Sequence, residues 1–201
     1  MNKQQSNKPI RLSAYIYLGI MTVVVGMLSC SNYSPKPYGY FRIDLPENTY
    51  TRFDSVYPPY TFEISTYAQV IPRHSKNSKE NWLDIVYPQY NGRIYCSYIK
   101  IDNDFRKLSE ESRDLVYKHT VRADAIIEHP YENDEEKVYG IFYEITGNAA
   151  SPMQFLLTDS TSHFLRGALY FNAIPNADSI APVSKFIEKD LKHLVETLRW
   201  K

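Results

Sequence analysis

The side chains that could act as nucleophiles, general bases or metal ligands are few and widely spaced in this sequence. No two histidines stand at the spacing of a metal-binding motif, and the five are His74, His119, His129, His163 and His193. A nucleophilic cysteine needs a neighbouring base and an electropositive setting. Cys96 instead alternates with apolar residues in a strand-like run, which predicts a buried structural thiol.

Other short patterns also fail as chemical sites. Asp102-Asn103-Asp104 begins like a calcium-binding loop, but Arg106 and Lys107 occupy the places of a ligand and a glycine, so a turn is expected. A Gly-rich phosphate loop and a nucleophile elbow are both missing from the sequence. The sequence therefore predicts a protein that is not an enzyme and that uses no metal or cofactor. A hydrolase whose site assembles only in space remains an alternative.

Cys30 is the residue whose surroundings predict a covalent modification. Residues 1–29 contain three basic side chains and no acidic one, and residues 12–29 are uncharged and mostly apolar. A basic head, an apolar run and the sequence Met27-Leu28-Ser29-Cys30 are typical of a bacterial lipoprotein signal that is cleaved before the cysteine. We therefore expect residues 1–29 to be a signal peptide and Cys30 to carry acyl chains, palmitate among them. The alternative is an uncleaved transmembrane anchor with an unmodified Cys30.

The charge balance changes once that segment is removed. The whole chain has a formal net charge of zero, whereas the chain from Cys30 onward has 20 basic and 23 acidic residues and a net charge of −3. Nothing in this balance points to a nucleic-acid partner, so none is expected, and a polybasic patch is not the membrane anchor. No acidic cluster follows Cys30, which favours a lipoprotein that faces the periplasm, with the inner leaflet of the outer membrane preferred to the inner membrane. An acylated Cys30 cannot form a disulfide with Cys96.

Three Asp-Ser dipeptides resemble the O-glycosylation consensus of bacteria. Their serines are Ser55, Ser160 and Ser179. The alternative is that these residues only form turns or cap a helix, because Asp and Ser side chains bond readily to nearby backbone groups.

The hydrophobic pattern predicts one domain of α+β class at residues 49–201, after a lipidated Cys30 and a Pro-rich tether at residues 30–48. Alternation and turn residues predict strands at residues 60–67, 81–87, 93–101, 137–146, 153–158 and 163–172. Asn91-Gly92 and residues 159–162 are expected to turn two of the hairpins. Short connections favour a mainly antiparallel sheet, and two main helices packed on it complete a sandwich.

Both helices are predicted from apolar residues at steps of three and four. The first begins near Ser109 and ends at Pro130. Its apolar face is expected to contain Leu115, His119, Ala123, Ile126 and Ile127. The second runs from about Pro182 to Leu198.

Tyrosine is the unusual residue of the composition. The chain contains 18 Tyr against 9 Phe, and eleven of the sixteen Tyr beyond residue 29 lie between Tyr33 and Tyr98. Such side chains can present an apolar body and a polar tip to a protein partner or stack on a carbohydrate. The alternative is that they simply fill a sheet, for which Tyr has a high propensity.

Several long segments resemble the gliding-motility lipoprotein GldD family. They are residues 33–46 (YSPKPYGYFRIDLP), 139–143 (YGIFY), 147–152 (GNAASP), 164–171 (FLRGALYF) and 198–201 (LRWK). The resemblance implies a lipoprotein required for gliding over surfaces and grouped with the proteins that work beside the type IX secretion system. It transfers no catalytic residue, and Cys30 matches the acylation site. By analogy, the element order also fits small α-β-α sandwiches of the PsbP/Mog1 kind.

The resemblance implies that the protein acts through contacts with other gliding-motility and type IX secretion proteins while its lipid holds it to a membrane. Two segments are predicted to make these contacts, because loops with unusual residues often carry function. They are the segment with Tyr38, Tyr40, Phe41, Arg42 and Asp44, and the loop with Gly147, Asn148, Ser151 and Pro152. The alternatives are an edge strand for the first and a tight crossover of small residues for the second. A binding module for a lipid, glycan or small ligand is the alternative function.

Overall fold

The computed structural model describes residues 15–21, 43–56, 58–74, 80–173 and 176–201. The chain divides into two compact units, Met1–Tyr40 and Phe41–Lys201. In the first unit, residues 15–21 are helical and exposed. Of the helices within the described ranges, none has the length and apolar character needed to cross a bilayer.

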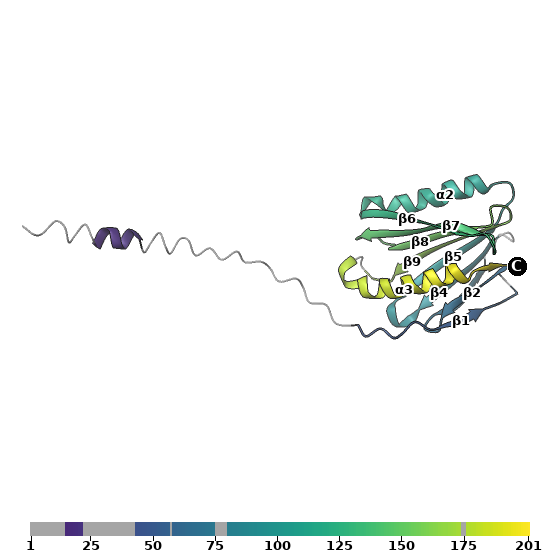
Figure 1. Ribbon diagram of the computed structural model, residues 1–201, viewed down its shortest axis with the longest axis horizontal. Coiled ribbons are helices and arrows are strands. Elements are labelled where there is room, and N and C mark those ends of the chain that lie inside the picture. Colours follow the sequence, from purple (N-terminus) through teal and green to yellow (C-terminus); the bar gives the residue numbers. More distant parts are fainter. Residues whose placement is uncertain (1–14, 22–42, 57, 75–79, 174–175) are drawn as a thin grey trace, which may run out of the picture. The chain divides into compact units, whose positions relative to one another are not determined.

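The second unit is an α+β sandwich, which confirms the predicted fold class (Figure 1). A seven-stranded sheet has the order β3-β4-β5-β9-β8-β7-β6, and a small sheet has the order β1-β2-β10, all pairs being antiparallel. The strands are β1 (Tyr50–Phe53), β2 (Tyr60–Ser65), β3 (Gln69–His74), β4 (Glu80–Tyr87), β5 (Gly92–Lys100), β6 (Ala123–Asn133), β7 (Val138–Gly147), β8 (Met153–Thr158), β9 (His163–Phe171) and β10 (Arg199–Trp200). The helices are α2 (Phe105–Tyr117) and α3 (Ala177–Thr197), with 3-10 turns η1 (Pro88–Tyr90) and η2 (Lys118–Val121).

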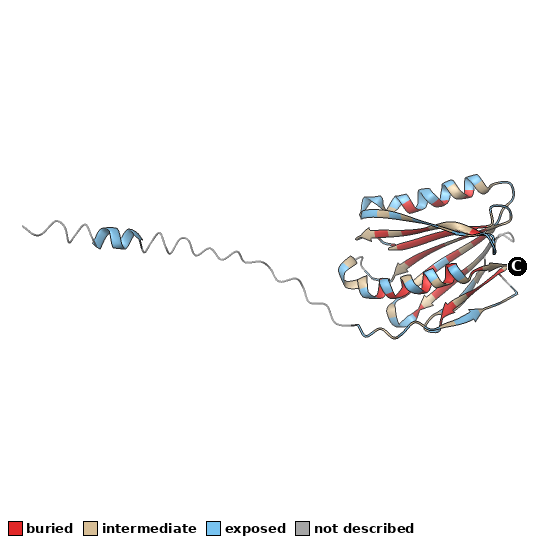
Figure 2. Ribbon diagram, in the orientation of Figure 1, coloured by how far each residue is buried: buried red, intermediate tan, exposed pale blue. Residues whose placement is uncertain are grey.

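The main core lies on one face of the large sheet, which we call the inner face. There α3 and strand β2 pack against alternate residues of the sheet, including Leu83, Ile85, Ile94 and Cys96. Figure 2 shows the buried residues gathered on the central strands and along one side of α3. Gly167 permits this packing, because a Cβ there would lie 2.2 Å from the ring of Phe155. Burial of apolar surface on this face is the dominant stabilising contribution to the fold.

The opposite, outer face is only half covered. Helix α2 buries Leu108 against Leu156 and Phe164, and Val116 against Tyr143 and Ile145. These contacts place α2 over β7, β8, β9 and the end of β5. Apart from the buried Asp84, the outer face of β3, β4 and most of β5 is left with exposed or half-buried side chains, Tyr95 among them.

The prediction of one helix from Ser109 to Pro130 was wrong in its second half. Helix α2 starts at Phe105 and ends at Tyr117, and Ala123–Asn133 is strand β6. The β-branched Ile126 and Ile127 suit a strand, and pairing with β7 along ten positions overrides the helical spacing. Pro130 is tolerated because β6 is the edge strand of the sheet.

The other differences between the predicted and the observed elements are smaller. Strands β1 and β3 were not predicted, and α3 begins at Ala177 rather than Pro182, which lies inside the helix. The Asn91 turn is confirmed by its left-handed φ of 50° between β4 and β5. The turn after β8 is also confirmed, since Asp159 Oδ1 accepts bonds from three backbone N–H groups.

Candidate functional site

The uncovered outer half of the sheet carries guanidinium and aromatic side chains from four adjacent strands, β3, β4, β5 and β9. Along β4 and β5, successive side chains alternate between the two faces of the sheet. Leu83 and Ile94 point to the inner face, so the residues next to each of them in sequence point to the outer face. Arg73 lies opposite Trp82 across β3 and β4, and Asp84 lies opposite Tyr95 across β4 and β5. We call this surface the arginine face, made of Arg73, Trp82, Asp84, Arg93, Tyr95 and Tyr170.

Asp84 organises the charges of the arginine face. Its side chain is 1% exposed, and its Oδ2 accepts a hydrogen bond of 3.2 Å from Arg93. Arg73 Nε lies 2.8 Å from Oδ1 as an ion pair, although the two atoms are not aligned for a hydrogen bond. The two arginine side chains are 38% and 43% exposed. One buried carboxylate therefore holds two guanidinium groups at the surface and neutralises only one of them.

Aromatic rings also contact the guanidinium groups of Arg73 and Arg93. Arg73 lies 5.0 Å from the ring centre of Trp82 and 5.3 Å from that of Tyr95. Arg93 lies 5.7 Å from the Tyr95 ring, which meets Tyr170 edge-on at 5.7 Å. Cation–π contacts of this kind keep the cations positioned without neutralising them. The arginine face is thus a preorganised cationic surface with aromatic sides.

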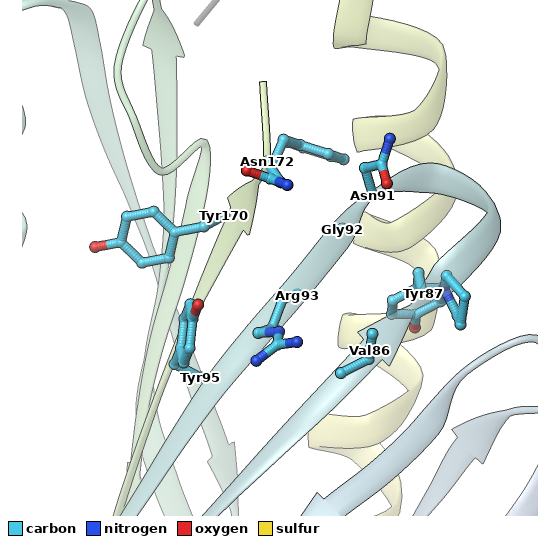
Figure 3. Close-up of a pocket in the computed structure, with 10 residues that line it drawn as sticks. Val86, Tyr87, Asn91, Gly92, Arg93, Tyr95, Tyr170 and Asn172 are labelled. Carbon is cyan, nitrogen blue, oxygen red and sulfur yellow. The ribbon is translucent and has the colours of Figure 1, made fainter. Parts of the chain in front are cut away.

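A pocket of about 540 Å³ opens at one end of the arginine face (Figure 3). Arg93, Tyr95 and Tyr170 line it, and two amide side chains, Asn91 and Asn172, lie at its far end. The backbone N–H of Asn172 bonds to the carbonyl of Asn91 at 2.9 Å, which joins the ends of β5 and β9. The volume lies in the range typical of ligand sites.

His119, expected on the first helix, lies on η2 beside the arginine face. Its ring is 6.4 Å from that of Tyr170. Burial and then the charge of Arg166 lower the pKa of His119 below the usual imidazole value. Arg166 donates to Gln154 Oε1 at 3.1 Å, and burial lowers the pKa of its guanidinium. Within the described residues, Arg166 Nε and Gln154 Nε2 have no hydrogen-bond partner.

The loop at residues 147–152 has a structural role in each described contact. Gly147 has a φ of 90°, and a Cβ there would lie 2.7 Å from the backbone nitrogen of Asp124. Asn148 Oδ1 accepts a 3.0 Å bond from the backbone N–H of Ala177 at the start of α3. Ser151 is 0% exposed and donates to the carbonyl of Met153, and the Pro152 carbonyl accepts from Ile145 N–H. This geometry supports the alternative of a tight crossover, and buried Ser151 has no surface to offer a partner.

Most predicted contact residues before the domain lie outside the described residues, and these are Tyr38, Tyr40, Phe41 and Arg42. The predicted acylation site, Cys30, also lies outside them. Asp44 is described and exposed in a segment without regular structure. A few residues later the chain is fastened to the domain, because Asn48 donates to Asp190 on α3 at 2.7 Å. Asp190 is buried and also accepts a 3.0 Å bond from the Tyr87 hydroxyl.

The three candidate glycosylation serines lie in a loop, a turn and a helix start. Ser55 is half-buried, and its carbonyl accepts a bond from Lys201. Ser160 is exposed with a left-handed φ of 65°. Ser179 lies in the first turn of α3, where its hydroxyl donates to the Asn176 carbonyl at 3.0 Å. Only Ser160 among them is both exposed and outside a helix.

The remaining chemical candidates lie in the core or apart from one another. Cys96 is buried on the inner face as expected, and burial raises the pKa of its thiol, so the thiolate nucleophile is disfavoured. Nowhere in the described ranges do three or more His, Cys, Asp or Glu side chains come together as a possible metal site. Most of the buried tyrosines fill the core, and they include Tyr60, Tyr87, Tyr98 and Tyr143. Tyr95 is instead exposed on the arginine face.

Sequence reasoning missed the arginine face, although part of its signal was present. The predicted strands at 81–87 and 93–101 place Trp82 with Asp84, and Arg93 with Tyr95, on one side of each strand. The sequence did not reveal that α2 leaves this side uncovered. No strand was predicted at Arg73, which belongs to β3.

Comparisons with known proteins identify the family. In structure, the chain is similar to cyanobacterial PsbP (CyanoP) from Synechocystis sp. PCC 6803, with 8% identity, a TM-score of 0.47, and coverage of 82% of this chain and 99% of that one. A likeness at this level supports no inference about function. A search of the curated proteins found no significant match. The model of the family described as gliding motility lipoprotein GldD matches residues 30–200, beginning at the predicted acylation site and ending one residue before the C-terminus. The chain therefore belongs to the gliding motility lipoprotein GldD family.

Proposed function

We propose that this lipoprotein is a non-enzymatic component of the gliding-motility machinery, associated with the type IX secretion system, and that it acts through protein contacts made by the arginine face. The family supplies the gliding role and the lipid anchor. The observation that carries the contact mechanism is the uncovered, preorganised half-sheet around Asp84. Exposed surfaces with arginine and aromatic residues are typical of protein interfaces.

In this proposal Cys30 carries the acyl chains and places the domain at a membrane. Stable attachment requires two or more chains, because a single chain binds a bilayer only reversibly. The domain then faces the periplasm, with the inner leaflet of the outer membrane as the preferred site. The absence of an acidic cluster after Cys30 in the sequence supports this orientation.

The proposal is tested by a crosslinked pull-down from membranes of cells that carry the wild-type chain or a variant. Wild type is expected to recover other motility or secretion proteins. The double charge reversal Arg73→Glu with Arg93→Glu is expected to lose them, because it replaces both surface cations. Arg106→Glu is the matched control, since Arg106 is 92% exposed on α2, whose Leu108 packs on Leu156 and Phe164 and not on the residues of the arginine face. Cys30→Ala tests the anchor separately.

Two results would contradict the proposal. If wild type recovers no motility or secretion component, the machinery role fails. If the double reversal recovers the same proteins as wild type, the arginine face is not the contact surface.

A second candidate function is a binding module for a lipid, a glycan or another small ligand. It is favoured by a groove of about 520 Å³ along α2, β6 and β7. Its apolar lining includes Phe105, Tyr131, Tyr139, Ile141 and Leu156. Extraction of the purified protein with organic solvent, followed by mass spectrometry, would reveal a co-purifying lipid or glycan that the contact mechanism does not require.

A further inference from the structure

We propose that the pocket at the end of the arginine face captures a carboxylate side chain of an acidic protein segment, with Arg93 as the residue that binds it. This inference rests on the proposed function and names the chemistry of the partner. It concerns the pocket shown in Figure 3, which is distinct from the Arg73 and Trp82 end of the arginine face.

The charge of the pocket selects an anion. A guanidinium group offers five N–H donors in a planar fork, and Asp84 accepts from one nitrogen of Arg93. Asp84 also pairs with Arg73, so the single carboxylate does not balance both cations. The Arg93 side chain is 43% exposed and retains donors that a second carboxylate can accept. A charge-assisted bond of this kind is about twice as strong as a neutral one.

The aromatic wall of the pocket favours a ligand that carries an apolar or aromatic group next to its carboxylate. Tyr95 and Tyr170 meet edge-on at 5.7 Å and form one wall, and Val86 contributes apolar surface to the lining. Figure 3 shows the Arg93 guanidinium lying between the tyrosines and Val86. An apolar or aromatic group next to the anion can therefore pack on the wall while the carboxylate reaches Arg93.

The far end of the pocket suits a polypeptide rather than an isolated anion. Asn91 and Asn172 are exposed, and each amide offers both a donor and an acceptor, as a peptide group requires. The pocket also continues into the arginine face, since Arg93 and Tyr95 belong to both. An extended segment can thus place one acidic side chain at Arg93 and continue towards Arg73 and Trp82.

The test uses the full acylated chain in detergent micelles. A peptide array should present short peptides that place Asp or Glu next to an aromatic residue, each paired with the matching Asn or Gln peptide. We expect the acidic peptides alone to be retained. The best of them, labelled with fluorescein, is then titrated by fluorescence polarisation. Arg93→Gln should weaken binding at least tenfold, which corresponds to about 1.4 kcal/mol. Arg93→Lys should restore only part of it, because a lysine cannot form the bidentate pair.

Three controls keep the proposal falsifiable. Arg106→Gln should bind like wild type. Tyr170→Ala should weaken binding without altering the charge, which separates the pocket from general electrostatic attraction. The thermal unfolding midpoint of each variant shows whether the fold is intact, and a variant that fails to fold is replaced by Asn172→Ala, which removes only the amide.

Several outcomes would overturn the proposal. They include an array that retains no acidic peptide, amide peptides that bind as well as the acidic ones, and displacement of the peptide by glucuronate at an equal concentration. The last result would make the pocket a site for acidic sugars. Self-association that requires Arg93 would likewise overturn it, because the occupant would be a second copy of the chain.

If Arg93→Gln keeps its membrane partners, the pocket inference fails while the proposed function stands. If wild type recovers no partner, the proposed function fails whatever the peptides show.

Discussion

The buried carboxylate of Asp84 accepts a hydrogen bond of 3.2 Å from Arg93 on the neighbouring strand. This pair explains how a sheet surface can carry two arginines in fixed positions without a covering helix. The carboxylate is 1% exposed, and its ion pairs with Arg73 and Arg93 offset the cost of burying its charge.

Replacing Asp84 with Asn should destabilise the fold by about 1–3 kcal/mol, because a buried charge-assisted hydrogen bond with Arg93 and the ion pair with Arg73 are lost. The midpoint of urea unfolding measures this, with an unchanged slope showing that the unfolded state is the same. Asp54→Asn is the matched control, since Asp54 is 53% exposed and solvent screens its ion pair with Lys201, so its loss should change the stability little. Equal stability of Asp84→Asn and wild type would show that the ion pairs do not hold the arginine face.

Removing the Asn148 side chain should cost about 1 kcal/mol of stability, because Asn148 Oδ1 caps the first N–H of α3. Asn148→Ala leaves that N–H without its acceptor, whereas Asn148→Asp keeps an acceptor and adds a negative charge near the helix N-terminus. Thermal unfolding of the two variants should therefore give a lower midpoint only for Asn148→Ala. If both variants lose stability alike, the loop acts through something other than the cap.

Stability should fall as the pH is lowered below about 6.5, the ordinary pKa of histidine. Burial lowers the pKa of His163, and burial followed by the charge of Arg166 lowers the pKa of His119. The unfolded chain therefore takes up protons first, and stability is lost as the pH falls towards the folded pKa values. Urea midpoints at pH 7.5 and pH 5.5 measure the loss.

The double substitution His119→Gln with His163→Gln should reduce that pH dependence. His163 also accepts or donates a 2.9 Å bond with the Tyr98 hydroxyl and stacks on Trp200, so the double variant is expected to be less stable at both pH values. The informative quantity is the difference between the two pH values. A wild-type protein that is more stable at pH 5.5 than at pH 7.5 would contradict the prediction.

Cys96 should react with a thiol reagent only when the domain unfolds. Its side chain is 3% exposed, and burial raises the pKa of the thiol, so both access and the thiolate are missing in the folded state. Labelling with iodoacetamide across a urea gradient should follow the loss of secondary structure. Rapid labelling in native buffer would show that the inner face opens or that Cys96 is reactive.

The sequence was sufficient for the elements whose pattern agrees with their packing. The apolar-rich runs of β7, β8 and β9 match strands with many buried positions, and β8 is buried along its whole length. The apolar stripe of α3 likewise matches the residues that the helix buries. The stretch from Ala123 to Asn133 was misassigned because Ala123 and Ile126 fit both a helical face and an edge strand, and only pairing with β7 decides between them. Local pattern cannot reveal such a pairing.

The candidate site was less predictable for a related reason. Trp82, Arg93 and Tyr95 occur in predicted strands, but their importance depends on which half of the outer face α2 covers. Tertiary packing decides that coverage, and the sequence pattern of the strands does not show it. The loop at Gly147 was singled out for its unusual residues, and the structure explains these by close backbone approach and the cap on α3.

The most direct test of the central proposal is site-specific photocrosslinking in living cells. A photoreactive phenylalanine analogue at Tyr95, which is 38% exposed in the middle of the arginine face, should crosslink to a motility or secretion protein. The same analogue at Thr51, exposed on β1 of the small sheet, should not. A partner captured from Tyr95 alone is the result we predict. Capture from Thr51 and not from Tyr95 would contradict the proposal that this protein works through the arginine face.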